Sequence, residues 1–449
     1  MARTITTDCP PVPKRKPDEP KRYTIEVITP LFGGGVESGV NDPITLIRPS
    51  SIRGHLRFWW RATRGAAFAT VKEMRQREAE IWGSTKNPSP VRIEVSVNRS
   101  AMPRKCAAPN GQWDALFDHT RLPYALFPFQ GDTEKSPDKF IESVEFELRV
   151  WIPPVTTMAS LREGFNQQRN ALKIPEIANR ENGLQDDVGL DVQAAIWAWV
   201  NFGGVGARTR RGCGAMYCKD LAPHSPKQIS AWFEKAKQDY KLSNHSTGLW
   251  PVLAAAPLIH GLSKPPLAAW NESIKLMYDF RQGSVGRNGF HRSYWPEADS
   301  LRALTGLGDA SHKRSNTLVH PIIKEDVAFP RAQFGLPIVF HFKDGSRDNV
   351  NNCELYPLDC NRMASPLILR PLAMGKTTAV PMVLQLNTPE PENLELKHLA
   401  PIAISPALGR TNIARPDLAT YPNSPMAGRT NTGSALEAFM AYAKQNGFL

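Results

Sequence analysis

The chain is long and basic, which favours a protein of two domains with a polyanionic partner such as nucleic acid. It has 449 residues, 41% of them apolar, with 55 Lys and Arg against 43 Asp and Glu and a net charge of +12. No run approaches about 18 uninterrupted apolar residues, so we expect no membrane span.

The first predicted elements surround a glycine-rich loop. Residues 1–22 are predicted to form a flexible, basic, Pro-rich lead-in. Residues 23–28 alternate in polarity and are β-branched, which predicts a strand. Gly33, Gly34 and Gly35 follow that strand. Consecutive glycines let backbone N–H groups approach a phosphate closely, so we expect this loop to contact RNA.

The next predicted helix carries arginines on one face. It spans residue 52 to about residue 68, with Ser50 or Ser51 as its cap. Its apolar residues fall on one stripe that includes Trp59 and Trp60, so we expect both tryptophans to pack into a core. No acidic residue lies within the helix. An adjacent stripe holds the side chains that we expect to face solvent and clamp successive phosphates: Arg53, Arg57, Arg61 and Arg64.

Three more residues of this basic segment belong to the predicted RNA-binding set. Phe58 lies off the apolar stripe near the arginine face, where it can stack on a base or pack within the protein. Arg48 and Ser50 stand where the glycine loop leads into the helix. A glycine loop that leads into an arginine-bearing helix is suited to holding a phosphate chain.

The first half completes an order of strand, helix, strand, strand, helix, strand. A second helical segment covers about residues 71–82. Strands are predicted at 91–97 and 144–152, a helix at 186–202, and a short strand at 215–218. This order is the ferredoxin-like pattern.

A second glycine loop, residues 203–214 (GGVGARTRRGCG), joins the last helix and strand of this pattern. It interleaves glycines with Arg208, Arg210 and Arg211, which we expect to contact RNA. The ferredoxin-like order should bring this loop beside the first one. The two loops are therefore predicted to form the two parts of one phosphate clamp.

The second half is predicted to repeat the pattern in degenerate form. Its expected elements are a strand within 251–260, a helix at 267–280, two short strands within 329–342, strands at 365–372 and 379–386, and a last helix at 435–445. A loop at 281–295 is rich in basic and aromatic residues and supplies Arg287, His291 and Arg292 as candidate RNA contacts. A structural loop, or a contact to another protein, is the alternative.

We therefore expect an α+β protein with two ferredoxin-like, RRM-like domains in tandem and long loops. The predicted division is a lead-in at 1–22, a first domain at 23–220, a connector at 221–248, a second domain at 249–386, and a Pro-rich tail with a terminal helix at 387–449.

Two runs of the sequence resemble a known family. Residues 29–63 (TPLFGGGVESGVNDPITLIRPSSIRGHLRFWWRAT) resemble the N-terminal signature of the first subunit of the Cmr complexes, which are type III-B CRISPR RNA-guided effectors. Residues 203–214 resemble the glycine-rich loop of the RAMP superfamily, to which that subunit belongs. Patchier similarity includes residues 290–302 and 329–340.

The resemblance implies two RAMP domains with ferredoxin-like RNA-recognition folds. It implies guide RNA, target RNA and other Cmr subunits as partners in antiviral defence. The family's place is at the 3′ side of the guide, where the 5′ end of a bound target arrives, and the family is not credited with cutting the target. The resemblance therefore implies an RNA-binding subunit without a catalytic role.

Two other functions stay open at this point. His55, beside Arg53 and Arg57, is a candidate general acid or base for metal-free RNA cleavage. No partner for His55 is placed by the sequence, and a single histidine on a helix is usually structural. The third function is a structural cap that grips neighbouring subunits through the aromatic-rich second half.

No metal, cofactor or nucleotide-hydrolysis site is predicted. The six cysteines are scattered and form no C-x-x-C pair, which favours a reducing cytoplasm over a disulfide framework. Cys213 and Cys218 lie close in sequence, but no second pair is evident to complete a zinc site. Residues 374–377 (MGKT) mimic the end of a P-loop and lack its earlier glycine.

Overall fold

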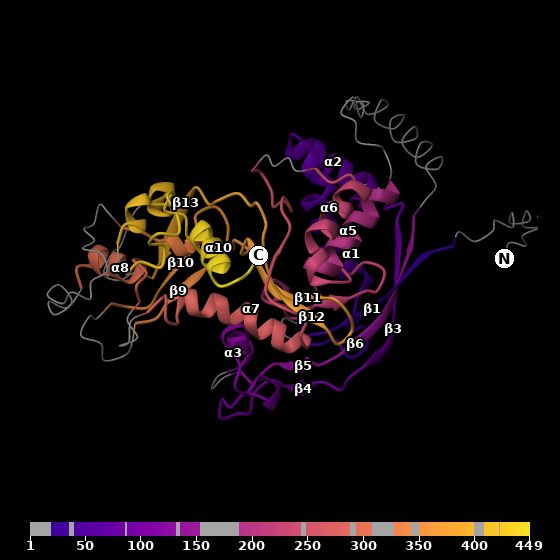
Figure 1. Ribbon diagram of the computed structural model, residues 1–449, viewed down its shortest axis with the longest axis horizontal. Coiled ribbons are helices and arrows are strands. Elements are labelled where there is room, and N and C mark those ends of the chain that lie inside the picture. The colour runs from indigo at the N-terminus through magenta and orange to yellow at the C-terminus, as the bar shows by residue number, and fades with distance from the viewer. Residues whose placement is uncertain are drawn as a thin grey trace, which may run out of the picture.

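The computed structural model describes residues 19–35, 40–85, 88–131, 135–152, 188–243, 248–287, 293–307, 327–342, 350–398, 408–421 and 423–449. These residues form helices and four antiparallel sheets (Figure 1). The expected α+β class is therefore confirmed. None of the helices described is long and apolar enough to cross a lipid bilayer.

The first sheet has the ferredoxin-like strand order. Its strands are β1 (Lys21–Val27), β3 (Arg92–Ser100), β6 (Val144–Trp151) and β7 (Met216–Tyr217), in the order β3-β6-β1-β7. Ile25 pairs with Phe146 in the register between β1 and β6, and both side chains are buried. Helix α1 (Pro49–Ala62) connects β1 to β3, and helix α5 (Val188–Phe202) connects β6 to β7. The two helices pack against each other.

Helix α1 begins differently from the prediction. Pro49 lies in its first turn, and its N-cap is Arg48, whose side chain makes no capping hydrogen bond. The predicted cap at Ser50 or Ser51 is therefore wrong. Proline suits the first helical position because its φ is already helical and its missing N–H would have no partner there. A 3-10 turn, η1 (Arg64–Ala67), and helix α2 (Val71–Trp82) follow α1.

A small second sheet extends the first half. It consists of β2 (Leu31–Phe32), β4 (Arg104–Lys105) and β5 (Lys139–Ile141), in the order β2-β5-β4. The other helical segments of this half are η2 (Ala115–Phe117), α3 (Leu122–Leu126), η3 (Phe127–Phe129), η4 (Thr209–Arg211), η5 (Pro226–Gln228) and α6 (Ile229–Asp239).

The second half repeats the strand order of the first. Strands β8 (Leu258–Ile259), β11 (Leu367–Ala373) and β12 (Ala379–Gln385) lie in the order β11-β12-β8, with helix α7 (Pro266–Arg281) packed on β11 and β12. Helix α10 (Ala435–Gln445) packs on α7. Leu449 and Ile259 then exchange backbone hydrogen bonds of 2.9 and 3.0 Å. The segment 387–449 thus supplies the second helix and the fourth strand position of this repeat.

A separate sheet lies at the far end of the second half (Figure 1, left). Its strands are β9 (Ile338–Phe340), β10 (Cys353–Pro357), β13 (Asn393–Lys397) and β14 (Leu408–Gly409), in the order β14-β13-β10-β9. Helical segments nearby are α8 (Glu297–Thr305), η7 (Pro330–Phe334), η8 (Arg410–Asn412) and η9 (Pro416–Ala419). The first strand predicted within 329–342 is wrong, because Pro330 starts the 3-10 turn η7 there.

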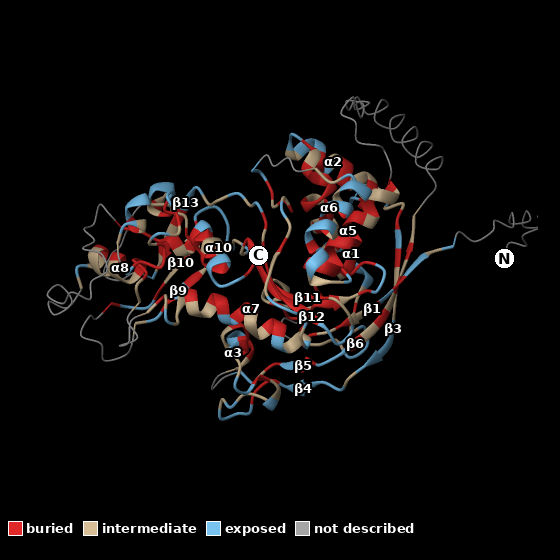
Figure 2. Cartoon of the chain, viewed as in Figure 1, coloured by how far each residue is buried: buried red, intermediate tan, exposed pale blue. Residues whose placement is uncertain are grey.

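The two halves share their hydrophobic core. Leu56 of α1 and Trp199 of α5 belong to the same buried cluster as Leu372 of β11 and Met382 of β12. Every residue of β11 is buried, and Figure 2 shows this buried strand in the centre of the molecule. The strands β11 and β12 therefore join the halves, and they fix the position of the second glycine loop.

Candidate nucleic-acid interface

The two glycine loops lie side by side, as the ferredoxin-like order predicts. The backbone N–H of Ala207 donates to the carbonyl of Phe32 at 2.7 Å, and that of Gly214 donates to the carbonyl of Pro30 at 3.0 Å. A Cβ on Gly34 would lie 3.7 Å from the Cα of Gly206. A Cβ on Gly206 would lie 2.4 Å from the carbonyl oxygen of Phe32, so glycine is needed at this position where the loops meet.

The first glycine loop has a conformation that requires glycine. Gly33 and Gly34 have φ of +62° and +96°. A Cβ on Gly35 would lie 2.4 Å from the carbonyl oxygen of Val40, to which the Gly35 N–H donates at 2.9 Å. Arg48 Nη2 donates to the carbonyl of Gly35 at 2.8 Å, so the arginine holds the loop.

Two central members of the arginine stripe on α1 are partly exposed, as expected, but each is paired with an acidic side chain. Arg57 Nε and Arg61 Nη1 both donate to Glu78 Oε1 of α2, at 2.7 and 2.5 Å. The Glu78 side chain is only 6% exposed, so it is a buried counter-ion. Arg53 is half-buried and donates from Nη2 to the carbonyl of Val91 at 3.0 Å. Helix α1 has no acidic residue of its own, and Glu78 of α2 supplies the carboxylate that pairs with Arg57 and Arg61.

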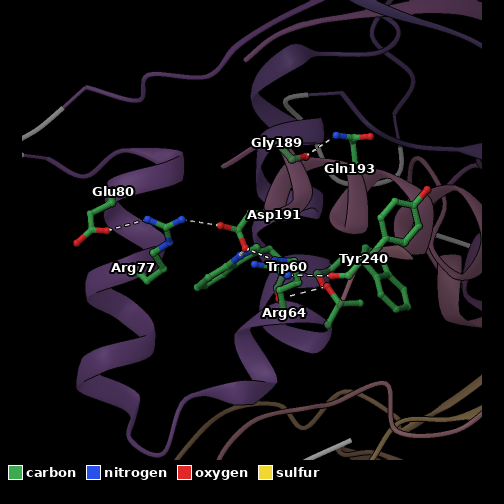
Figure 3. A network of polar contacts seen from close by, with 10 residues as sticks. Trp60, Arg64, Arg77, Glu80, Gly189, Asp191, Gln193 and Tyr240 are labelled. Atoms are coloured by element: carbon green, nitrogen blue, oxygen red, sulfur yellow. Dashed lines mark hydrogen bonds and ion pairs between the residues drawn. The ribbon is translucent and has the colours of Figure 1, made fainter. Parts of the chain in front are cut away.

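Arg64, the last arginine of the predicted stripe, is buried. Its side chain is 2% exposed, and its Nε donates to Asp191 Oδ1 of α5 at 2.6 Å (Figure 3). Arg77 of α2 and the indole N–H of Trp60 donate to the same carboxylate at 2.8 and 3.0 Å. Arg64 Nη1 also donates to the carbonyl of Tyr240 at 2.9 Å. This network fastens α1 to its neighbours and removes Arg64 from any surface.

The aromatic residues of α1 lie largely where their spacing predicts. Trp59 and Trp60 are buried in the core, as predicted. Phe58 is half-buried and packs edge-on against Trp59, with ring centroids 5.3 Å apart. The guanidinium of Arg210 lies over the Phe58 ring, 5.3 Å from its centroid. Phe58 thus links α1 to the second glycine loop.

The arginines of the second glycine loop reach across to the second half. Arg210 Nη1 donates to the carbonyl of Ser365, and Arg211 Nη1 donates to that of Leu367 at 3.0 Å. Trp270 of α7 donates its indole N–H to the carbonyl of Arg211 at 2.5 Å. Burial lowers the pKa of Arg210 and of Arg211 to about 10, so both remain charged at neutral pH.

Arg281, at the end of α7, joins the three loop arginines in one positive cluster. It donates from Nη1 to the Tyr124 hydroxyl at 3.1 Å. Its charge, after burial, helps to lower the pKa of Arg211. We call this set the arginine cluster: Arg208, Arg210, Arg211 and Arg281. Among the residues that the structure describes, no member makes an ion pair with Asp or Glu, and the Nε atoms of Arg208 and Arg281 are buried without a hydrogen-bond partner.

A cluster of arginines without carboxylates suits a polyanion, because no acidic side chain among the described residues neutralises its positive charge. The pattern of glycines and arginines in the second glycine loop predicted three members of the arginine cluster, Arg208, Arg210 and Arg211. The sequence does not predict a role for Arg281, because this residue ends an ordinary amphipathic helix and only the packing of α7 brings it to the loop. The one sequence feature that includes Arg281 is the basic and aromatic loop at 281–295, which begins with this residue.

The remaining predicted residues are spread out. Ser50 is exposed in the first turn of α1, and Arg287 is half-buried, with a backbone bridge to Ser293. His291 and Arg292 lie outside the described residues. His55 is half-buried and stacks on Trp199, with ring centroids 6.3 Å apart, and burial lowers its pKa. No group of three His, Cys, Asp or Glu side chains placed to hold a metal ion occurs in the described ranges.

Part of this chain is similar to known proteins. Residues 24–217 match the family model described as the RAMP superfamily. A curated relative, the CRISPR system Cmr subunit Cmr1-2 of Pyrococcus furiosus, is 24% identical over 198 residues, which are 43% of this chain and 92% of the relative.

Solved structures with a similar arrangement include two Cmr proteins. The crystal structure of apo Cmr1 from Pyrococcus furiosus has a TM-score of 0.42 and 16% identity, covering 81% of this chain and 87% of that one. A chain in the cryo-EM structure of type III-B Cmr-beta bound to cognate target RNA has a TM-score of 0.45 and 14% identity, covering 82% and 94%. Residues 24–217, the part of the chain that matches the RAMP superfamily model, contain both glycine loops.

Proposed function

We propose that this chain is a non-catalytic RNA-binding subunit of a type III-B Cmr effector complex. In this role it holds single-stranded RNA, either the 3′ side of the guide or the 5′ end of the target, next to other Cmr subunits in the cytoplasm. The observation that carries the proposal is the arginine cluster beside the paired glycine loops, where four guanidiniums gather without a carboxylate partner among the described residues.

The chemistry of the cluster favours backbone recognition over sequence readout. Arg208 and Arg281 are half-buried and make no ion pair with Asp or Glu among the described residues, so their positive charge is available to a phosphate, although their Nε atoms are themselves buried. Arg210 and Arg211 are anchored to carbonyls and contribute charge to the same site. Contacts of this kind position an RNA strand and carry little base specificity. The relation to a Cmr subunit supports RNA as the polyanion.

Binding of end-labelled single-stranded RNA to the full chain tests the proposal. Arg208→Glu and, separately, Arg281→Glu should each weaken binding by about 10- to 100-fold, as expected for loss of a charged hydrogen bond. Each should also reduce the slope of log affinity against log salt by about 0.7 per lost phosphate contact. Lys227→Glu, an exposed charge reversal at η5, is the matched control and should leave affinity nearly unchanged. Equal binding by all variants at low salt would refute the site.

An assay for cleavage of the same RNA distinguishes the proposed RNA-binding subunit from an endoribonuclease. We expect no new fragments, because His55 stacks on Trp199 and donates to no acidic side chain in the part of the chain described. Fragments that disappear in His55→Ala would favour an endoribonuclease instead. Retained association with other Cmr subunits, without any RNA binding by the unaltered chain, would favour a structural cap.

A further inference from the structure

One aromatic ring beside the arginine cluster is exposed. Within the described residues, Phe127 is the one Phe, Tyr or Trp whose side chain is exposed, at 64%. It opens the turn η3, directly after α3. A single exposed ring is ordinary on a protein surface, so its surroundings decide what it can do.

Arg208 of the arginine cluster lies over this ring. The Arg208 Cζ is 5.8 Å from the Phe127 ring centroid. The Arg208 backbone has φ of +54°, a conformation that residues with side chains rarely adopt and that is concentrated at functional sites. Burial lowers the pKa of Arg208, and its Nε has no hydrogen-bond partner. A cation and an exposed π-face are thus held together at the edge of the second glycine loop.

The first glycine loop fixes the position of the ring. Phe129 stacks on Phe32, with centroids 4.3 Å apart and ring planes 6° apart, and Phe32 directly precedes Gly33. The carbonyl of Phe129 accepts a hydrogen bond of 2.8 Å from the N–H of Asp138. The turn η3 is therefore anchored to both the loop and its sheet, and Phe127 projects from a rigid support.

We infer that Phe127 and Arg208 form a stacking platform for one unpaired base of single-stranded RNA. The inference rests on the proposed RNA-binding function. In this arrangement the base lies against the free face of Phe127 while the guanidinium of Arg208 binds an adjacent phosphate. Stacking accepts every base because each has a π-face, so the platform recognises unpaired RNA without reading its sequence.

Fluorescence of 2-aminopurine tests the platform. The full chain is titrated with single-stranded RNAs that carry the fluorescent base at successive positions, and stacking quenches the signal at one of them. Phe127→Ala and Phe127→Leu should abolish that quenching and weaken binding by about 5- to 150-fold, the value for one stacked base. Phe127→Trp should retain both. Leu262→Ala, another exposed apolar side chain in a loop, is the control and should change neither.

The salt dependence distinguishes stacking from phosphate contact. Phe127→Ala should leave the slope of log affinity against log salt unchanged, whereas Arg208→Glu reduces it. Salt-dependent RNA binding with quenching and affinity within about twofold in Phe127→Ala would overturn the platform and leave the proposed function standing. Loss of association with another Cmr subunit in Phe127→Ala, with RNA binding unchanged, would also overturn it. Failure of the unaltered chain to bind RNA would overturn both proposals.

Discussion

Arg370 of β11 donates a hydrogen bond to the carbonyl of Gly203, at the start of the second glycine loop. Arg370 is fully buried, and it also donates to the carbonyls of Val200 and Met216 at 3.4 Å. A side chain of the second half therefore caps the end of α5 in the first half. The last carbonyls of a helix lack partners within the helix, and a cation is favoured there.

Removing this cap should destabilise the whole chain. Arg370→Met keeps an apolar side chain of comparable length and leaves buried carbonyls without donors, so we expect a loss of about 2–4 kcal/mol in the free energy of unfolding. Arg370→Lys keeps one charged donor and should lose less. Urea unfolding followed by tryptophan fluorescence measures both. A Met variant as stable as the unaltered chain would show that the cap contributes nothing.

Asp191 should be among the most sensitive positions for stability. Asp191→Asn would leave Arg64 and Arg77 buried without the carboxylate that both contact, which should cost about 3–5 kcal/mol. The control is Asp239→Asn, which breaks the exposed pair with Lys235 on α6 and should cost below about 1 kcal/mol. Thermal or urea unfolding compares the two variants. Equal losses would contradict the special role of the buried network.

The arginines paired with Glu78 should matter more for folding than for RNA. Arg57→Gln with Arg61→Gln removes both partners of a buried carboxylate, so we expect a loss of about 2–4 kcal/mol in unfolding free energy. Adding Glu78→Gln should recover part of that loss. RNA affinity of the folded protein should change less than about threefold, because Glu78 already occupies these guanidiniums. If the Arg57→Gln, Arg61→Gln variant lost most of its RNA affinity while keeping its stability, the result would favour the prediction that the arginines of α1 bind phosphates.

Gly206 should be required for the contact between the two glycine loops. It has φ of +81°, and an added Cβ would lie 2.4 Å from the carbonyl oxygen of Phe32. Gly206→Ala should therefore reduce both stability and RNA affinity. Gly261→Ala is the matched control, since φ is +67° there and nothing lies within 4 Å of the added Cβ. The control should lose only about 1–2 kcal/mol of stability from backbone strain, with RNA affinity unchanged.

His55 should make the stability of the chain fall in mild acid. Burial lowers its pKa below the ordinary 6.5, so the unfolded chain takes up the proton first as pH decreases. The contribution of His55 to stability is complete at pH values above the pKa that it has in the unfolded chain. As the pH falls from that value toward its pKa in the folded chain, stability decreases by up to about 1.4 kcal/mol per pH unit. His55→Asn should show a shallower decline between about pH 7 and pH 5 in urea unfolding. An identical pH profile in both proteins would exclude His55 as the cause.

Local sequence spacing was sufficient for the ferredoxin-like unit of the first half, but it did not predict the small sheet of β2, β4 and β5 or helix α6. The alternation of residues 23–28 and 144–152, and the helical stripe that buries Trp59 and Trp60, depend on backbone periods that act within a few residues. The order of those elements then leaves few sheet topologies. The adjacency of the two glycine loops followed from that order.

The sequence by itself determined the basic character of the chain, the ferredoxin-like order and both glycine loops. Only the tertiary structure decided which arginines lack an acidic partner and so remain available to bind RNA. Glu78 and Asp191, which neutralise the stripe on α1, come from helices α2 and α5, and Arg281 and Phe127 reach the arginine cluster through the packing of α7 and α3. Spacing within one element says which residues share a face, but what covers that face depends on contacts between residues far apart in the chain.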